Sequence, residues 1–179
     1  LLSHYSTTAD HSYSSCVNFA AADFTTTSLP TNQRLDQTSH FDPFSYTQAA
    51  HFPPEGGDLD QPVCPTRSEA EILLMSDSVT QLHSKINALT AYGNTSIDVG
   101  MKWATTILDP GTRPVIADMI ANGDVAAVNA GRPVDFTTPG TLKVIVVMTD
   151  GENTNQFELK DTFQDGWSDV YYNATANRY

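Results

Sequence analysis

Residues 142–153 read Leu-Lys-Val-Ile-Val-Val-Met-Thr-Asp-Gly-Glu-Asn, and this stretch decides the fold that the sequence predicts. Six of the seven residues in 142–148 are apolar, and three of those are valines. A short apolar run rich in β-branched residues is typical of a strand buried on both faces of a parallel sheet. The sequence therefore predicts an α/β fold in which residues 142–148 form a central strand.

A carboxylate stands directly after this predicted strand. Asp150 is followed by Gly151, which would let the backbone turn sharply. In open α/β sheets, ligands bind outside the carboxyl ends of the strands, and a carboxylate there suits a hard cation. The alternative is an Asp-Gly turn that only closes a core strand. The residues by themselves leave both interpretations open.

Two stretches repeat apolar residues at three- and four-residue steps, which predicts two helices. The repeating residues are Val79, Leu82, Ile86 and Leu89 in the first stretch, and Ile97, Met101, Ala104 and Leu108 in the second. A short apolar run at 72–75 predicts a strand before the first helix. The prolines and glycine of 109–114 predict the end of the second helix, and residues 115–128 hold a weaker helical pattern.

Thr95 lies at the amino terminus of the second predicted helix. Residues 95–98 match a capping box, in which the Thr95 hydroxyl would do no more than cap that helix.

The chain of 179 residues is long enough for one domain. Residues 3–66 are polar and contain six prolines, so we expect a long insertion there. Residues 71–108 are expected to form a strand-helix-helix core, and 109–140 a second insertion. Residues 141–154 would hold the central strand and a metal-binding loop, and 155–179 a polar and aromatic insertion.

The net charge is −12, because 21 acidic residues face 9 basic ones. Such a surface repels phosphate backbones, so no nucleic-acid partner is expected. No apolar run approaches the length of a membrane span. The chain opens on Leu1 without a start methionine, so we expect it to be part of a longer protein whose membrane tether lies in a segment absent here.

The chain has two cysteines, Cys16 and Cys64, in surroundings rich in serine, threonine and proline. They stand far apart with no histidine pair nearby, which does not suit a metal site. They form either a disulfide, which indicates an oxidising compartment, or two unrelated thiols. The five histidines show no ligand spacing.

The order of these features resembles a known family. The run Gly-Asn-Thr-Ser-Ile-Asp-Val-Gly at 93–100 opens a helix, and the run Val-Ile-Val-Val-Met-Thr-Asp-Gly-Glu-Asn-Thr follows at 144–154. This arrangement resembles the von Willebrand factor type A domain and its metal-ion-dependent adhesion site. It is more similar still to the C-terminal region of TadG-like proteins of the tight-adherence (Flp) pilus assembly system, with further matches at 64–65 and 72–77. The likeness covers about a third of the chain and implies a doubly wound, mostly parallel sheet, truncated at both ends.

The resemblance also implies a metal site. By position, Thr95 and Asp150 match the family's second-loop threonine and third-loop aspartate, which bind a divalent cation, most often Mg²⁺, with Mn²⁺ or Ca²⁺ as alternatives. The family's first ligand loop reads D-x-S-x-S, and residues 10–14 match it literally. The residues before Asp10 cannot form a buried strand, so 10–14 are left out of the site and the true loop is expected upstream of residue 1.

The function that the resemblance implies is that of a non-enzymatic protein of pilus assembly in the cell envelope, on its periplasmic or extracellular face. A carboxylate of a pilus or envelope protein would complete the metal coordination. No nucleophile–base pair is recognisable, so no catalytic residue is assigned. The alternatives are a cytoplasmic von Willebrand A scaffold of an ATPase complex, a metal-dependent hydrolase, and a structural domain with a degenerate metal site.

Overall fold

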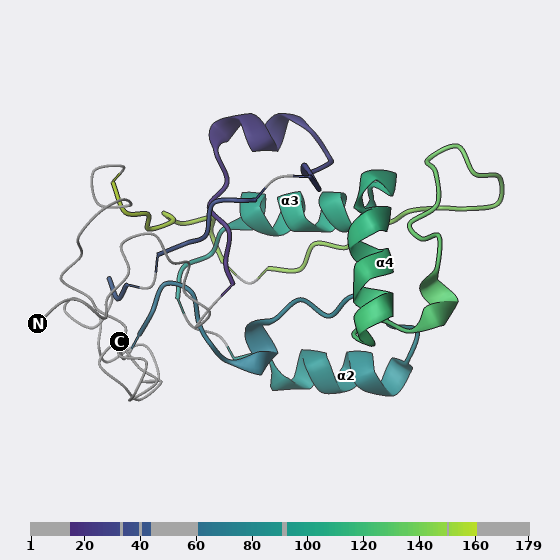
Figure 1. Cartoon of the computed structure of the whole chain (residues 1–179). Coiled ribbons are helices and arrows are strands. Elements are labelled where there is room, and N and C mark those ends of the chain that lie inside the picture. Colours follow the sequence, from purple (N-terminus) through teal and green to yellow (C-terminus); the bar gives the residue numbers. More distant parts are fainter. Residues whose placement is uncertain are drawn as a thin grey trace, which may run out of the picture.

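The computed structural model describes residues 15–32, 34–39, 41–43, 61–90, 93–149 and 151–160, and within them the chain is helical (Figure 1). Three α-helices lie in these described residues: α2 (Val79–Ala88), α3 (Ile97–Leu108) and α4 (Arg113–Asn122). Short 3-10 helices are η1 (Ala21–Thr25), η3 (Ser68–Ala70), η4 (Pro110–Thr112) and η5 (Ala127–Asn129). None of the helices in this part of the chain has the length and hydropathy to cross a bilayer.

The two helices predicted from apolar spacing are confirmed as α2 and α3. The predicted end of the second helix is also correct, since α3 ends at Leu108. Arg113 and Pro114, however, begin α4, because a proline in the first turn loses no helical hydrogen bond. Helix α4 ends at Asn122 and is capped by Gly123, whose φ of 87° is the left-handed conformation that glycine adopts without a steric penalty.

The predicted doubly wound parallel sheet is wrong. The described residues contain no strand, and their β-type pairing is an isolated antiparallel bridge between Val17 and Gln37. Residues 72–75 are irregular, with Met75 at a φ of 49°. Residues 142–149 have no regular secondary structure and make no backbone hydrogen bond to the described chain. Apolar β-branched residues only favour a strand, whereas a ladder requires a second segment at the right edge.

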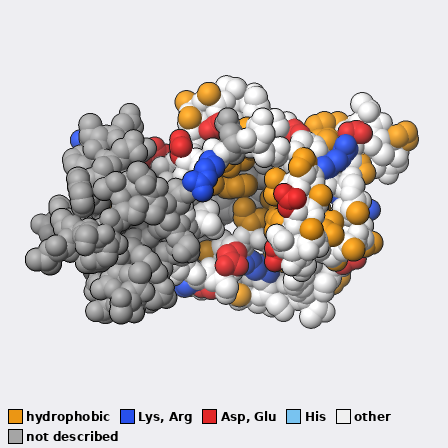
Figure 2. All heavy atoms as spheres, in the orientation of Figure 1, with side chains coloured by type: hydrophobic (Ala, Val, Ile, Leu, Met, Phe, Trp, Pro, Cys, Tyr) orange, Lys and Arg blue, Asp and Glu red, His pale blue; other side chains and the backbone are white. Residues whose placement is uncertain are grey.

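Few large apolar side chains are buried in the described chain. The buried ones are Phe19, Cys64, Ile116 and Val125. By contrast, Leu142 is 85% exposed and Met148 is 91% exposed, and the apolar face of α2 also lies open. Figure 2 shows apolar side chains at the surface of the described part, some of them in a hollow. Within the described part of the chain, neither α2 nor the segment 142–148 contributes a buried side chain to an apolar core.

The buried face of α3 is polar at its centre. Lys102 is 3% exposed, and its Nζ donates hydrogen bonds to the carbonyl oxygens of Thr26 at 2.7 Å and Ser28 at 2.9 Å. One helical turn later, the buried Thr106 hydroxyl donates to the Thr27 carbonyl at 3.1 Å. These three bonds hold residues 26–28 against α3, which satisfies polar groups that would otherwise be costly to bury.

The same loop contacts the carboxylate at the end of α3. The Thr27 hydroxyl donates to Asp109 Oδ2 at 2.5 Å, and the Gly111 backbone N–H donates to Oδ1 at 2.8 Å. The hydrogen bond from Thr27 is the main cause that holds the pKa of Asp109 below its ordinary value, and Gly111 and the nearby lysines add to it. A lowered folded-state pKa means that this stabilisation is complete above the ordinary pKa and is lost as the pH falls through the folded-state value.

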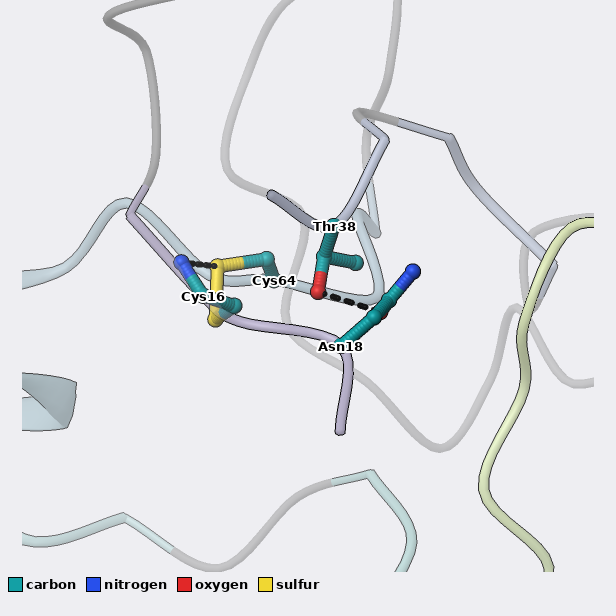
Figure 3. Close-up of a disulfide and its surroundings, with 4 residues drawn as sticks. All are labelled: Cys16, Asn18, Thr38 and Cys64. Atoms are coloured by element: carbon teal, nitrogen blue, oxygen red, sulfur yellow. Dashed lines mark hydrogen bonds between the residues drawn. A yellow bond between two sulfur atoms is a disulfide. The ribbon is translucent and has the colours of Figure 1, made fainter. Parts of the chain in front are cut away.

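The structure contains the disulfide that was one of the two alternatives for the cysteines (Figure 3). Cys16 and Cys64 are joined with an S–S distance of 2.00 Å, and Cys64 is 2% exposed. The Cys16 carbonyl accepts the backbone N–H of Thr38 at 2.9 Å, and the Thr38 hydroxyl donates to Asn18 Oδ1 at 2.7 Å. The bridge and these hydrogen bonds together therefore connect three segments of the polar region, at residues 16–18, 38 and 64.

The described parts of the predicted 3–66 insertion pack against the helices. The buried ring of Phe19 contacts Trp103 of α3 edge-to-face, with ring centroids 5.4 Å apart. Phe24 of η1 makes a similar contact with Phe19 at 5.8 Å. Aromatic pairs of this geometry add to the stabilisation that their burial provides.

We predict that reduction of the Cys16–Cys64 disulfide lowers the free energy of unfolding by roughly 2–4 kcal/mol, because the reduced unfolded chain gains conformational freedom. Urea unfolding with and without reductant measures the difference. The Cys16→Ser/Cys64→Ser double variant is the control and should be insensitive to reductant. Equal stability of the oxidised and reduced chains would contradict a structural role for the bridge.

We predict that Lys102→Met destabilises the fold by roughly 2–3 kcal/mol, because two backbone carbonyls lose a charged donor inside the protein. Lys85→Met is the matched control, since Lys85 is not buried and its Nζ donates to a single carbonyl, that of Ser68, at 2.6 Å in an exposed hydrogen bond. Its cost should stay below about 1 kcal/mol. Urea unfolding of both variants makes the comparison, and equal losses would refute the importance of the buried contact.

Candidate functional site

Two loops that the sequence analysis paired lie against each other in the structure. Thr154 N–H donates to the Thr95 carbonyl at 2.8 Å, and Thr95 N–H donates to the Thr154 hydroxyl at 2.7 Å. Asn94 Nδ2 donates to the carbonyl of Asn155 at 2.8 Å. Residues 94–97 and 151–155 are therefore joined by reciprocal hydrogen bonds although they are far apart in sequence. We refer to these two segments together as the loop pair.

The loop pair also provides the amino-terminal cap of α3. Asn153 Oδ1 accepts the backbone N–H of Ile97, the first residue of the helix, at 2.7 Å. The N-cap residue is Ser96, whose side chain makes no capping bond and donates instead to Asp98 Oδ1 at 2.8 Å. The capping box predicted for Thr95 is therefore wrong. The first turn of α3 is satisfied by a side chain from the distant loop, which a local sequence pattern cannot reveal.

The backbone on either side of position 150 has a defined local geometry. The Thr149 hydroxyl accepts the N–H of Gly151 at 3.3 Å and donates to the carbonyl of Gly151 at 3.2 Å. Gly151 does not adopt a left-handed φ, and a Cβ atom built on it would lie 3.8 Å from Thr95 Oγ1, an ordinary contact. The chain bends at Gly151, as expected, but without the left-handed conformation that glycine adopts most easily. Gly151, which directly follows Asp150 in the sequence, therefore lies beside the Thr95 side chain.

Of the two predicted metal ligands, the structure describes one. Thr95 is half-buried, and its hydroxyl makes no hydrogen bond within the described chain. Asp150 lies outside the described residues, and so does the literal D-x-S-x-S match at residues 10–14. The structure therefore brings Thr95 beside Gly151, the residue that follows Asp150 in the sequence.

The donor atoms at the loop pair are oxygens, which suits a hard divalent cation. The Thr95 hydroxyl oxygen is available, Glu152 is an exposed carboxylate within the loop pair, and Asp98 is an exposed carboxylate in the first turn of α3. Across the part of the chain that the structure describes, no group of three or more histidine, cysteine, aspartate or glutamate residues is arranged to hold a metal. A cation here would thus depend on the Asp150 carboxylate together with hydroxyls and water.

The residues that join the loops were not singled out from the sequence. Asn153 and Thr154 stand three and four residues after Asp150, and their side chains bond the backbone of the other loop. Short polar side chains such as these often bond backbone groups, which was the available signal. Their partners, however, lie in a segment more than fifty residues away, and only the folded chain identifies them.

We predict that Asn153→Ala destabilises the start of α3 by about 1 kcal/mol, the usual cost of losing a side-chain cap. Asn155→Ala is the matched control, because Asn155 contributes its backbone carbonyl to the loop pair and keeps it in the variant. Amide hydrogen exchange of the first turn of α3 measures the effect. Faster exchange in Asn155→Ala than in Asn153→Ala would be inconsistent with this assignment.

No family model matches this chain, and no curated protein or solved structure is significantly similar to it. These comparisons therefore neither support nor oppose the resemblance to TadG-like proteins. The functional conclusion that follows consequently depends on the loop pair, on the disulfide and on the sequence motifs.

Proposed function

We propose that this chain is a non-enzymatic protein of the cell envelope that binds a partner protein through a divalent cation held at the loop pair. The observation that carries the proposal is the contact between the Thr95 loop and the loop that begins at Gly151. The two sequence blocks that resemble TadG-like proteins are the same two segments that the structure joins. The proposal keeps this functional resemblance and does not depend on the sheet that the resemblance also implied.

The cation would be held by the Thr95 hydroxyl and the Asp150 carboxylate. A divalent ion with one aspartate, hydroxyl groups and water keeps a net positive charge and an exchangeable position. A carboxylate from a pilus or envelope protein would fill that position. The chain's own contribution is to bring the two loops together, which Asn94, Asn153 and Thr154 do through hydrogen bonds to the opposite backbone. Mg²⁺ is the expected ion, with Mn²⁺ or Ca²⁺ as alternatives.

The location in the envelope is supported by the disulfide. A Cys16–Cys64 bridge with one sulfur buried is suited to an oxidising compartment and is hard to maintain in a reducing cytosol. This favours the envelope over the alternative of a cytoplasmic scaffold in an ATPase complex. The net charge of −12 also favours a protein partner over a nucleic acid.

We predict that Asp150→Ala weakens Mg²⁺ binding at least about tenfold, roughly 1.4 kcal/mol, because the site loses an anionic oxygen donor. Thr95→Val should also weaken binding, whereas Thr95→Ser keeps the hydroxyl and should bind nearly as tightly as the parent chain. Isothermal titration calorimetry of each variant with MgCl₂ gives the affinities.

Asp118→Ala is the control for net charge, because Asp118 is an exposed carboxylate on α4, outside the loop pair. It should bind Mg²⁺ as the parent chain does. Equal affinities of the parent chain and Asp150→Ala would remove the cation site. That result would favour the remaining alternative, a structural domain whose metal site is degenerate.

A further inference from the structure

The hydrogen bond between Asn153 and Ile97 joins the two segments close to both proposed cation ligands. Asn153 Oδ1 accepts the Ile97 N–H at 2.7 Å. Ile97 stands two residues after Thr95 in the sequence, and Asn153 stands three residues after Asp150. Gly151 lies beside the Thr95 hydroxyl. A movement that breaks the bond therefore lets the segment that follows Asp150 move away from the segment that carries Thr95.

Ser96, which could cap α3 locally, does not replace Asn153. Ser96 is the N-cap residue, but its side chain makes no capping bond, and its hydroxyl donates to Asp98 Oδ1 at 2.8 Å. Within the described residues, the Ile97 N–H bonds the side chain of the distant loop. The protection of this one N–H therefore reports whether the loop pair is joined.

The hydrogen bonds of the loop pair are open to solvent. The side-chain bonds made by Asn94, Asn153 and Thr154 across the loop pair are all exposed, and so are residues 151–158. Such bonds give a modest net stabilisation and belong to the parts of a protein that open most readily. The loop pair is thus expected to open more often than the buried contacts that Lys102 makes with the loop at 26–28.

We infer that Asn153 is a positioning residue for the cation, and that its bond to Ile97 couples cation binding to the amino terminus of α3. The inference rests on the proposed function. An ion that takes oxygens from Thr95 and Asp150 holds both only while the two segments are joined, so it stabilises the joined arrangement by mass action. The coupling is reciprocal: the cap favours the ion, and the ion protects the cap.

Amide exchange of Ile97, followed by NMR in the 179-residue chain, tests this coupling. At a MgCl₂ concentration ten times the dissociation constant, exchange should slow about tenfold, because the opening that releases this N–H also releases the ion. NaCl at the same ionic strength should have no such effect, and the amides of α4, outside the loop pair, serve as the internal reference. This measurement needs no variant, so it does not depend on the stability of a mutant chain.

The Asn153→Ala variant separates the coupling from a purely local cap. Its Ile97 N–H lacks the side-chain partner whether or not the ion is bound, so MgCl₂ should leave the exchange nearly unchanged. Isothermal titration calorimetry should show Mg²⁺ binding weakened about threefold to fivefold, the larger figure corresponding to a cap worth about 1 kcal/mol. Asn155→Ala is the matched truncation and should bind Mg²⁺ as the parent does, because Asn155 contributes its backbone carbonyl.

A conservative variant provides the rescue. Asn153→Asp keeps a side-chain oxygen that can accept the Ile97 N–H, so MgCl₂ should again slow the exchange of this amide. Asn155→Asp carries the same added charge without the cap, and it controls for the attraction of Mg²⁺ to a further carboxylate. An affinity gain common to both aspartate variants is an effect of charge, whereas the rescued protection of Ile97 is specific to position 153.

The outcomes distinguish this inference from the proposed function. A parent chain that does not bind Mg²⁺, or that binds it no better than Asp150→Ala does, removes the cation site and the inference with it. If the parent binds and Asp150→Ala does not, an Ile97 exchange rate that is unchanged by MgCl₂ overturns the inference alone. Equal Mg²⁺ affinities of Asn153→Ala and Asn155→Ala do the same, and in both cases the cation site stands.

Discussion

The buried ammonium of Lys102 is the contact on which the arrangement of the described chain depends. It holds the loop at 26–28 against α3 by donating to two carbonyls, and Trp103 beside it receives the ring of Phe19. At the far end of the helix, Lys143 bonds the carbonyl of Leu108. Because few apolar side chains are buried among the described residues, these polar contacts to α3 take over much of the positioning that an apolar core usually provides.

The same helix positions the candidate site. The first turn of α3 has unsatisfied N–H groups, and Asn153 satisfies one of them from the distant loop. The amino-terminal end of α3 and the candidate site therefore form one structural unit. The hydrogen bond from Ile97 to Asn153 helps to keep Gly151 beside Thr95. A loop pair that is built by hydrogen bonds before any ligand arrives is a suitable frame for a cation, since little ordering remains to be done when the ion binds.

The helices could be predicted from the sequence and the sheet could not, for a physical reason. An amphipathic helix closes its own backbone hydrogen bonds, so the spacing of Val79, Leu82 and Ile86 was sufficient to predict α2. A strand takes its hydrogen bonds from another segment. The valines of 142–148 therefore indicated a preference for a strand, but the described chain supplies no partner, and the predicted sheet was wrong.

For the candidate site, the sequence by itself determined which residue types stand at 95 and 150–154, and the resemblance suggested that the two loops meet. The described part of the tertiary structure decided which atoms hold them together: Asn94, Asn153 and Thr154 bond opposite backbone groups, and Ser96 rather than Thr95 occupies the N-cap. It also decided that Cys16 and Cys64 are joined. A sequence motif reflects the conformational preference of neighbouring residues. Hydrogen bonds and disulfides between distant segments depend on how the whole chain folds.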